Sequence, residues 1–432
     1  NGGLVSAATA RSAAVHTLLS GPAAGAVGAL AVAKASGSPT AIAFDMGGTS
    51  TDVSWLDQAM PFTSEGTVGG WPVRVPMVDI HTVGAGGGSI AYLDTGGALR
   101  VGPRSAGADP GPACYGRSDL FTVTDANLLL GRLHADSFLG GTMPLDRERA
   151  RAAAETLAHR AGLQPHTLAA GVVRIANANM ERAIRVVSVH RGHDPRDAAL
   201  VAFGGAGGMH ACELATALNV KTVVVPRFAG VLSAFGMLQA DVTRDYLSTV
   251  LRRLEGDDAS ELAFVHERLE AVAHDDLVKE GISRDRIELE RLADLRYVGQ
   301  SYEISVGLGP GVRERFHAEH RRRYGHDAPQ HAIECVSARV RARGILVKAS
   351  LPTLAPAIAA PVPIATHTTW FNGRGFETPV FDLDALGSGV ASVGPALLAG
   401  ASATVVIPPR VRYDIDSFGN VTCHLPARRS RS

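Results

Sequence analysis

The first half of the chain repeatedly runs from apolar residues into a cluster of glycines. The stretch AIAFDMGGTSTDVSW, residues 41–55, is apolar, then rich in glycine and hydroxyl groups, then apolar again. This pattern predicts a strand over 40–46, a turn, and a second strand over 51–57.

A second apolar run, AALVAFG at 198–204, enters the glycine cluster GGAGG. Apolar spacing then predicts a helix over 209–218, and TVVVP predicts a strand over 222–226. The order strand, glycine turn, helix, strand is typical of a parallel α/β layer.

Further elements are predicted on either side of these runs. Residues 20–37 form a helix whose small residues indicate very close packing, with Pro22 in its first turn. Residues 73–83 predict a strand that ends in GAGGGS, and helical spacing recurs over 146–161 and 168–190.

The pattern changes after about residue 245. Residues 255–285 are charged and helical, residues 313–326 form a basic amphipathic helix, and long alternating strands lie between and after them. Short strands separated by Pro/Gly turns follow from 349 onward. The chain is therefore divided into an α/β domain at 1–245 and a mixed α+β domain at 246–432.

Composition narrows the functional classes. The 432 residues include 42 basic and 42 acidic side chains, so the overall charge indicates neither nucleic acid nor an anionic membrane as a partner. No apolar run reaches the roughly 18 residues that a membrane span requires. The four cysteines are far apart and form no CxxC pair, which favours reduced thiols and a cytoplasmic location.

The segment DMGGTSTD combines the groups needed to hold a metal and a phosphate. Gly47 and Gly48 let backbone N–H groups approach an anion, and Asp45 and Asp52 can bind Mg²⁺ that bridges to phosphate or can orient a water. Both acids are candidate catalytic residues and metal ligands. The hydroxyls that add donors are those of Thr49, Ser50 and Thr51. The alternative is a β-hairpin with a polar turn and no ligand.

Two other glycine clusters are candidate nucleotide contacts. In FGGAGG, glycines at the end of a strand allow an adenine or ribose to lie against the backbone. The alternative is a tight strand-to-helix turn without a ligand, and the cluster GAGGGS carries the same two interpretations. The candidate nucleotide-binding residues of the two clusters are Gly204, Gly205 and Gly207, and Gly86 and Gly87.

Histidines and cysteines near these turns add little chemistry by pattern alone. His81 and His210 could act as acids or bases, but each is interpreted as an ordinary hydrogen-bonded histidine. Cys114 and Cys212 flank glycine-rich segments without an evident paired histidine, so a nucleophilic role is not predicted.

The motifs taken together resemble those of the hydantoinase A/5-oxoprolinase family, over essentially the whole chain. They occur in the family's order: SGPAAGAVGA, DMGGTSTDVS, VPMVDIHTVGAGGGSIA, VGPRSAGADPGPACYG, TVTDANLLLGRL, GHDPRDAALVAFGGAGG, VLSAFGMLQAD, DLRYVGQSYE and VGPALLAGASATVVIPP. The family includes ATP-dependent hydantoinase A subunits, 5-oxoprolinases and β-type subunits of acetone and acetophenone carboxylases.

The resemblance implies an actin-like (sugar kinase/Hsp70-like) ATPase fold with ATP and Mg²⁺ as cofactors. DMGGTSTD would be its phosphate-binding hairpin, and FGGAGG would take the position of the adenosine motif. The implied activity is ATP-dependent phosphorylation of a carbonyl oxygen and opening of a cyclic amide of the hydantoin or 5-oxoproline type. A hydantoinase B-type subunit and assembly into an oligomer are also implied.

The sequence departs from the family pattern in two places. The family's DxGGTFTD-type motif, expected upstream, has no second copy here, so the chain is expected to lack the N-terminal half of the clamp. The usual proline after GGAG is Gly208. Three other functions stay open: a subunit of an ATP-dependent ketone carboxylase, a small-molecule kinase of the same fold, and a non-catalytic nucleotide-binding scaffold.

Overall fold

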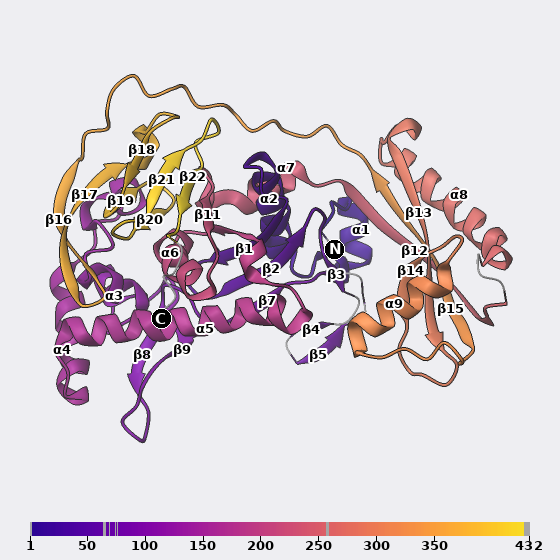
Figure 1. The fold of residues 1–432 in the computed structure, drawn as a ribbon, viewed down its shortest axis with the longest axis horizontal. Helices are drawn as coiled ribbons and strands as arrows, with labels where there is room; N and C mark the ends of the chain where they lie inside the picture. The colour runs from indigo at the N-terminus through magenta and orange to yellow at the C-terminus, as the bar shows by residue number, and fades with distance from the viewer. Residues whose placement is uncertain are drawn as a thin grey trace. The chain divides into compact units, whose positions relative to one another are not determined.

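The computed structural model describes residues 2–63, 66–68, 70–73, 75, 77–255 and 259–426. Contacts along the chain divide it into two compact units (Figure 1). The larger unit comprises Gly21–Pro61, Val78–Leu238 and Ser350–Ser432, and the smaller unit comprises Asn1–Ser20, Phe62–Met77 and Gln239–Ala349. Each unit therefore combines segments that are distant in the sequence.

The larger unit is built on a mixed sheet with the strand order β18-β21-β22-β11-β10-β1-β2-β7. Strand β10 runs parallel to β1 and to β11, whereas β2 is antiparallel to β1, so the predicted parallel layer is confirmed. Every residue of β10 is buried, as expected for a parallel strand covered on both faces. The strands of this sheet are β1 (Thr40–Met46), β2 (Thr51–Asp57), β7 (His81–Val83), β10 (Ala199–Phe203), β11 (Thr222–Val225), β18 (Ala391–Val393), β21 (Arg412–Ile415) and β22 (Val421–His424).

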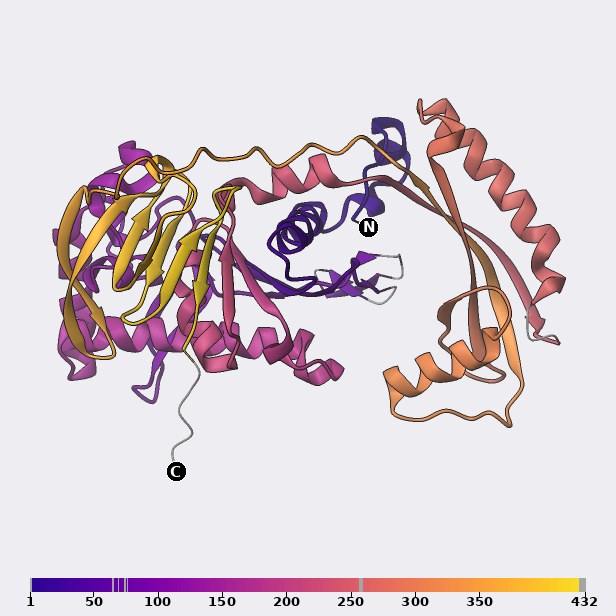
Figure 2. The same cartoon turned by 45° about the horizontal axis from the view of Figure 1, so that its top comes forward.

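Helices cover both faces of this sheet, with α2 on one side of β1 and β2 and α5 on the other (Figure 2). A Cβ atom on Gly25 of α2 would lie 2.8 Å from the Phe203 ring, and one on Gly28 would lie 2.8 Å from the Leu232 carbonyl oxygen. The close packing predicted from the small residues of this helix is thereby confirmed. The helices concerned are α2 (Ser20–Ala35), α3 (Val123–Leu129), α4 (Arg147–Ala161), α5 (Pro165–Val187), α6 (Gly207–Leu218) and α7 (Leu232–Gln239).

The C-terminal segment forms a second sheet in the larger unit, with the order β16-β17-β19-β20. Strand β20 packs against α6, and a Cβ atom on Gly208 would lie 2.7 Å from the Thr404 carbonyl oxygen. Glycine at 208 therefore allows this strand to approach the helix. The bounds are β16 (Ala365–Phe371), β17 (Arg374–Asp382), β19 (Ala396–Ala399) and β20 (Thr404–Ile407), beside the hairpin β8 (Ser89–Leu93) and β9 (Leu99–Ser105).

The smaller unit is organised by an antiparallel sheet with the order β12-β15-β13-β14. Phe316 is fully buried in its core, and the Arg339 guanidinium lies 2.8 Å from the Asp294 carboxylate in a buried ion pair. The elements are α1 (Ala7–Ser12), α8 (Ala263–Lys279), α9 (Val312–Tyr324), β12 (Val242–Arg253), β13 (Ile287–Tyr297), β14 (Ile304–Gly307) and β15 (Ile333–Gly344), with the short strands β3 (Phe62–Thr63), β4 (Gly66–Val68), β5 (Trp71–Val73) and β6 (Met77–Val78).

The compact units do not follow the predicted division at residue 245. Residues 350–432 were expected to join residues 246–349 in one domain, but they pack in the larger unit. The physical reason is pairing: β22 is hydrogen-bonded to β11, and β21 to β22, so the end of the chain extends the first sheet. Short strands between Pro/Gly turns carry no sequence signal for the sheet they join.

The predicted strand over 73–83 is replaced by the short strands β5, β6 and β7, while residues 74 and 76 lie outside the described residues. The helix predicted over 255–285 is shorter, Ala263–Lys279, and residues 256–258 also lie outside the described part. Among the described residues, no helix is both long and apolar enough to cross a bilayer.

Candidate active site

The site is built on the β1–β2 hairpin, where two carboxylates face each other. Asp45 and Asp52 are direct partners in the antiparallel register, so their side chains lie on the same face of the sheet. Burial, and to a lesser degree the Asp52 carboxylate, raise the pKa of Asp45 to about 6. Burial also raises the pKa of Asp52, opposed by a hydrogen bond from the Thr82 hydroxyl. A bound cation would relieve this accumulation of buried negative charge.

The GAGGGS turn docks on the tip of this hairpin. The Gly87 amide donates to the Gly47 carbonyl oxygen at 3.0 Å, and the Gly88 amide donates to the Gly48 carbonyl oxygen at 2.6 Å. A Cβ atom on Gly86 would lie 2.7 Å from the Thr49 amide nitrogen. Glycine is therefore required where the two turns meet.

The FGGAGG turn completes the cluster from the end of β10. The Ala206 amide donates to the Met46 carbonyl oxygen at 3.0 Å. Gly204 has φ +76°, and its Cβ would lie 2.4 Å from an Asp45 carboxylate oxygen. Gly204 thus holds a conformation that favours glycine, directly against one of the two acids.

The three turns surround a cavity of about 120 Å³. Gly47, Gly48, Gly87 and Gly205 line it, together with the C-terminal segment 400–404. The volume is below the roughly 300–1,000 Å³ of typical small-molecule pockets, so the cavity accommodates one part of a larger ligand. The rings of Tyr115 and Phe138 also line this cavity, giving it apolar surface beside the exposed backbone.

The other predicted site residues lie behind or beside this cavity. The buried Thr51 hydroxyl donates to the Ala85 carbonyl oxygen at 2.5 Å, so it joins two turns instead of facing a ligand. Gly86 and Gly207 are buried within their turns, and Thr49 is exposed while Ser50 is half-buried. The fold thus brings the predicted glycine turns together, with Asp45 directly against Gly204. Neither the two acids nor the three predicted hydroxyls line the cavity itself.

The carboxylate pair fits a hard divalent cation. Mg²⁺ is commonly held by one or two carboxylates, with waters and substrate phosphates completing its octahedral shell. Asp45 and Asp52 supply that number of carboxylates beside a glycine-lined cavity. In the described part of the chain, no group of three or more His, Cys, Asp or Glu side chains could hold a metal. The donor set therefore suits an ion shared with a phosphate, not an all-protein cage.

A family model for Hydantoinase/oxoprolinase matches residues 1–246. The chain belongs to this family. The predicted resemblance is thereby confirmed, and Asp45, Asp52 and all three glycine turns lie inside the matched region.

Known relatives of this hydantoinase/oxoprolinase chain are similar along nearly all of it. It is 36% identical to caprolactamase subunit alpha of Pseudomonas jessenii over 96% of its own length and 62% of the relative. It is 34% identical to 5-oxoprolinase 1 of Arabidopsis thaliana, over 94% of its own length and 34% of the relative. The chain therefore spans only part of the length of these relatives.

Solved structures share the mixed α/β fold. The ATP-dependent caprolactamase from Pseudomonas jessenii matches with a TM-score of 0.82 and 34% identity, covering 93% of this chain and 61% of that one. A nucleotide-free acetone carboxylase matches with a TM-score of 0.77 and 25% identity, covering 94% of this chain and 61% of that one.

Helix α3 of the hydantoinase/oxoprolinase chain contains residues that were not predicted as part of the site. The Thr124 amide and hydroxyl both donate to the Gly87 carbonyl oxygen, at 2.8 and 2.9 Å. The buried Asp125 carboxylate accepts from the amides of Cys114 and Thr122, each at 2.8 Å. The available signal was the capping-box spacing in TVTD, which marks a helix start but not its contact with a glycine turn.

A buried polar network lies next to the FGGAGG turn. The His210 ring contacts the Asn177 amide oxygen through Nδ1 at 2.6 Å and the Asn127 amide nitrogen through Nε2 at 3.2 Å. Burial lowers the pKa of His210 to about 4, so the ring is neutral at pH 7. The adjoining Glu213 carboxylate accepts from the Arg132 guanidinium at 2.6 Å. His210 is a hydrogen-bonded core histidine, in agreement with its interpretation from the sequence.

Cys114 and Cys212 are buried. Burial, with the nearby Asp125 carboxylate, raises the pKa of the Cys114 thiol far above its usual range. A thiol that stays protonated is a poor nucleophile, which agrees with the absence of a predicted nucleophilic role.

Proposed function

We propose that this chain is a subunit of an enzyme that opens a cyclic amide in an ATP-dependent reaction. The observation that carries the proposal is the convergence of three glycine turns on one cavity, with two facing carboxylates on the hairpin that supplies one of these turns. The similarity of the chain to a caprolactamase subunit and to 5-oxoprolinases, within the hydantoinase/oxoprolinase family, also supports this proposal.

In this proposal the residues of the chain position the metal ion and the phosphate groups of ATP. Asp45 and Asp52 would hold Mg²⁺, and the backbone around Gly47, Gly48 and Gly87 would lie against a phosphate. Bound ATP would supply a phosphoryl group that makes the amide oxygen a better leaving group. Such transfers depend mainly on positioning and charge neutralisation, which this geometry offers.

The proposed architecture is one half of an actin-like ATPase clamp, with an opposing phosphate-binding half and a B-type subunit contributed by the whole enzyme. Two features support this. The cavity of about 120 Å³ suits only one part of a nucleotide, and the chain covers 62% of the caprolactamase subunit alpha that it resembles. A cyclic amide would then be bound where these parts meet the hairpin.

The test is phosphate release by the complex purified through this chain, with Mg-ATP and either caprolactam or 5-oxoproline. We expect the lactam to stimulate ATP hydrolysis, and Asp45→Asn to lower the stimulated rate by at least about 100-fold, because it removes charge from the metal site. Asp57→Asn, at the exposed far end of β2, is the matched control and should retain activity. ATP hydrolysis stimulated by sugars but by neither lactam would contradict the proposal.

A second candidate is ATP-dependent carboxylation of a ketone. The structural similarity to acetone carboxylase, with a TM-score of 0.77, favours keeping it. The higher identity to the caprolactamase subunit, 36%, ranks cyclic amide opening first. Stimulation of the same assay by acetone with bicarbonate, and by no lactam, would reverse this order.

A further inference from the structure

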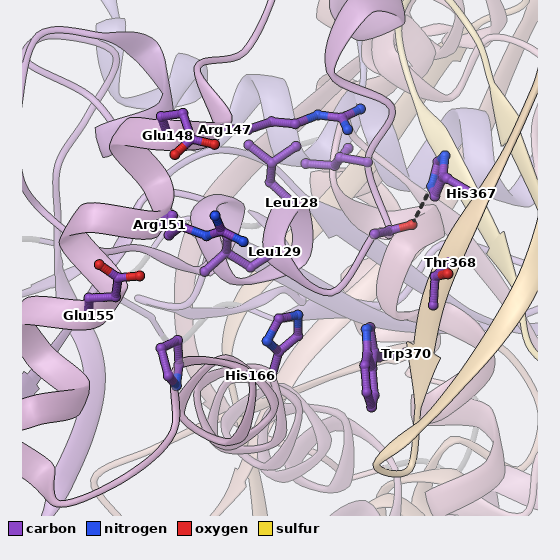
Figure 3. A pocket seen from close by; sticks show the side chains of 13 residues that line it. Leu128, Leu129, Arg147, Glu148, Arg151, Glu155, His166, His367, Thr368 and Trp370 are labelled. Carbon is purple, nitrogen blue, oxygen red and sulfur yellow. Dashed lines mark hydrogen bonds between the residues drawn. The ribbon is translucent and has the colours of Figure 1, made fainter.

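A second, larger cavity of about 570 Å³ lies in the larger unit, outside the glycine turns (Figure 3). Its walls come from α4, the start of α5, β16, the end of α3 and the turn that follows α3. The volume lies within the roughly 300–1,000 Å³ typical of small-molecule sites. Leu133 lines both cavities, so they are neighbours in the fold.

One wall of this cavity is fixed by hydrogen bonds between distant segments. The Gly131 carbonyl oxygen accepts from the Thr369 hydroxyl at 2.8 Å. It also accepts from His367 Nε2 at 2.9 Å, the bond drawn as a dashed line in Figure 3. Gly131 has φ +67°, and a Cβ there would lie 2.2 Å from the Thr368 carbonyl oxygen. Strand β16 is therefore held directly against the turn, and the cavity is preformed.

The opposite wall presents charges of both signs from α4. Arg147, Glu148, Arg151 and Glu155 all line the cavity. Arg151 is three residues from Glu148 and four from Glu155, spacings that allow ion pairs on a helix. Within the described chain, however, no nitrogen–oxygen distance of 4.0 Å or less joins these groups, whereas such a pair forms on α5 between Arg185 and Glu181.

This charge pattern selects among ligand classes. Two arginines and two glutamates sum to a formal charge of zero, so a polyphosphate would meet repulsion as well as attraction. A ligand with one carboxylate and one ammonium group satisfies both signs. Arginine can bind a carboxylate through two parallel hydrogen bonds, and glutamate accepts from an ammonium group.

Apolar surface lies among these charges. The rings of His166 and Trp370 are 5.1 Å apart between centroids and inclined by 48°. Leu128 and Leu129 line the cavity on the side of α3. A short aliphatic chain between the two charged ends of a ligand would be buried against this surface.

We propose that this cavity binds an amino acid whose carboxylate and ammonium groups are separated by a short aliphatic chain. Arg147 and Arg151, one turn apart on α4, would bind the carboxylate, and Glu155, one turn further on, would bind the ammonium group. This identification of the ligand class rests on the proposed function. Hydrolysis of a cyclic amide breaks the C–N bond and adds the elements of water, which leaves one carboxylate and one amine on the same chain. The cavity would then be a binding site for the product.

The test is calorimetric titration of the full chain, without ATP, using 6-aminohexanoate, the amino acid that opening of caprolactam yields. We expect saturable binding that Arg151→Gln and Glu155→Gln each weaken by about 10-fold, equivalent to about 1.4 kcal/mol. Arg149→Gln is the matched control, because Arg149 is an exposed arginine of α4 outside the cavity lining. Thermal unfolding of each variant checks that the fold is retained.

Hexanoate carries only the carboxylate and hexylamine only the ammonium group, so titrations with them test whether the site needs both charges. Binding of either as tightly as 6-aminohexanoate would overturn the proposal, as would no binding of 6-aminohexanoate at millimolar concentration or an equal effect of Arg149→Gln. The assay is independent of ATP. If 6-aminohexanoate binds but lactams do not stimulate ATP hydrolysis, the proposed binding site stands and the proposed function fails. If lactams stimulate ATP hydrolysis but 6-aminohexanoate does not bind, the proposed function stands and the proposed binding site fails.

Discussion

At the scale of single residues, the site contains a conflict between stability and ligand binding. Burial of the Asp45 carboxyl in the hairpin, and to a lesser degree the neighbouring Asp52 carboxylate, disfavour its charged form and raise its pKa from 3.8 to about 6. Between these two values the folded chain keeps a proton that the unfolded chain has released. Stability of the free protein therefore falls as pH rises from about 4 to about 6.

Replacement of Asp45 by asparagine should remove this penalty. In the absence of metal and nucleotide at pH 7, we expect Asp45→Asn to increase the free energy of unfolding by on the order of 2 kcal/mol. The gain should shrink toward pH 4, where Asp45 is already protonated. Urea unfolding at both pH values measures it, with Asp57→Asn as the matched acid-to-amide control. A loss of stability at pH 7 would show that hydrogen bonds of the carboxylate outweigh its burial.

At the scale of elements, glycine turns fix how strands and helices meet. Gly204 is required for two reasons: its φ is +76°, and its Cβ would lie 2.4 Å from the Met46 carbonyl oxygen. Gly162, at the C-terminus of α4, has a similar φ of +64° but open space around its Cβ position. Comparing the two separates backbone strain from steric contact.

We expect Gly162→Ala to destabilise the protein by about 1 kcal/mol, the lower end of the cost of a left-handed backbone for alanine. Gly204→Ala should cost at least about 2 kcal/mol more, since the β1–β10 contact must also move. Chemical unfolding of the two variants measures the difference. An equal decrease in the free energy of unfolding for both variants would mean that β10 can shift away from β1 without an energetic cost.

At the scale of the whole molecule, the chain leaves the larger unit and returns to it. Residues 350–432 supply β16 to β22, and their segment 400–404 lines the glycine-turn cavity. This returning segment begins with an exposed stretch, in which the Ile358 and Val362 side chains are 103% and 82% exposed. The stretch is accessible to proteases, whereas the strands after it are paired.

We predict that limited proteolysis cleaves near Ile358–Val362 and that the resulting pieces stay together. The C-terminal piece should co-elute with the rest during size exclusion, because β22 remains hydrogen-bonded to β11 and β20 remains packed on α6. The two pieces should separate in concentrated urea, which is the control. Release of the C-terminal piece under native conditions would contradict this pairing with the larger unit.

Local patterns were sufficient for much of this fold. The strands β1, β2, β10 and β11 were predicted nearly to the residue, because apolar runs that end in glycine or aspartate define both burial and termination. The role of Thr51 was not predictable, since its hydroxyl is satisfied by Ala85, a partner 34 residues away. The contribution of Thr124 was missed for the same reason: its partner is the Gly87 carbonyl oxygen, which only the folded chain brings near.

By itself the sequence determined the family, the glycine turns and the two acids, because each is encoded by neighbouring residues with definite backbone preferences. Tertiary structure alone decided that Asp45 and Asp52 face each other, that three turns share one cavity, and that residues 400–404 complete it. It also decided that α4 and β16 line a second cavity. These features depend on strand register and on contacts between residues up to hundreds of positions apart, which no local pattern specifies.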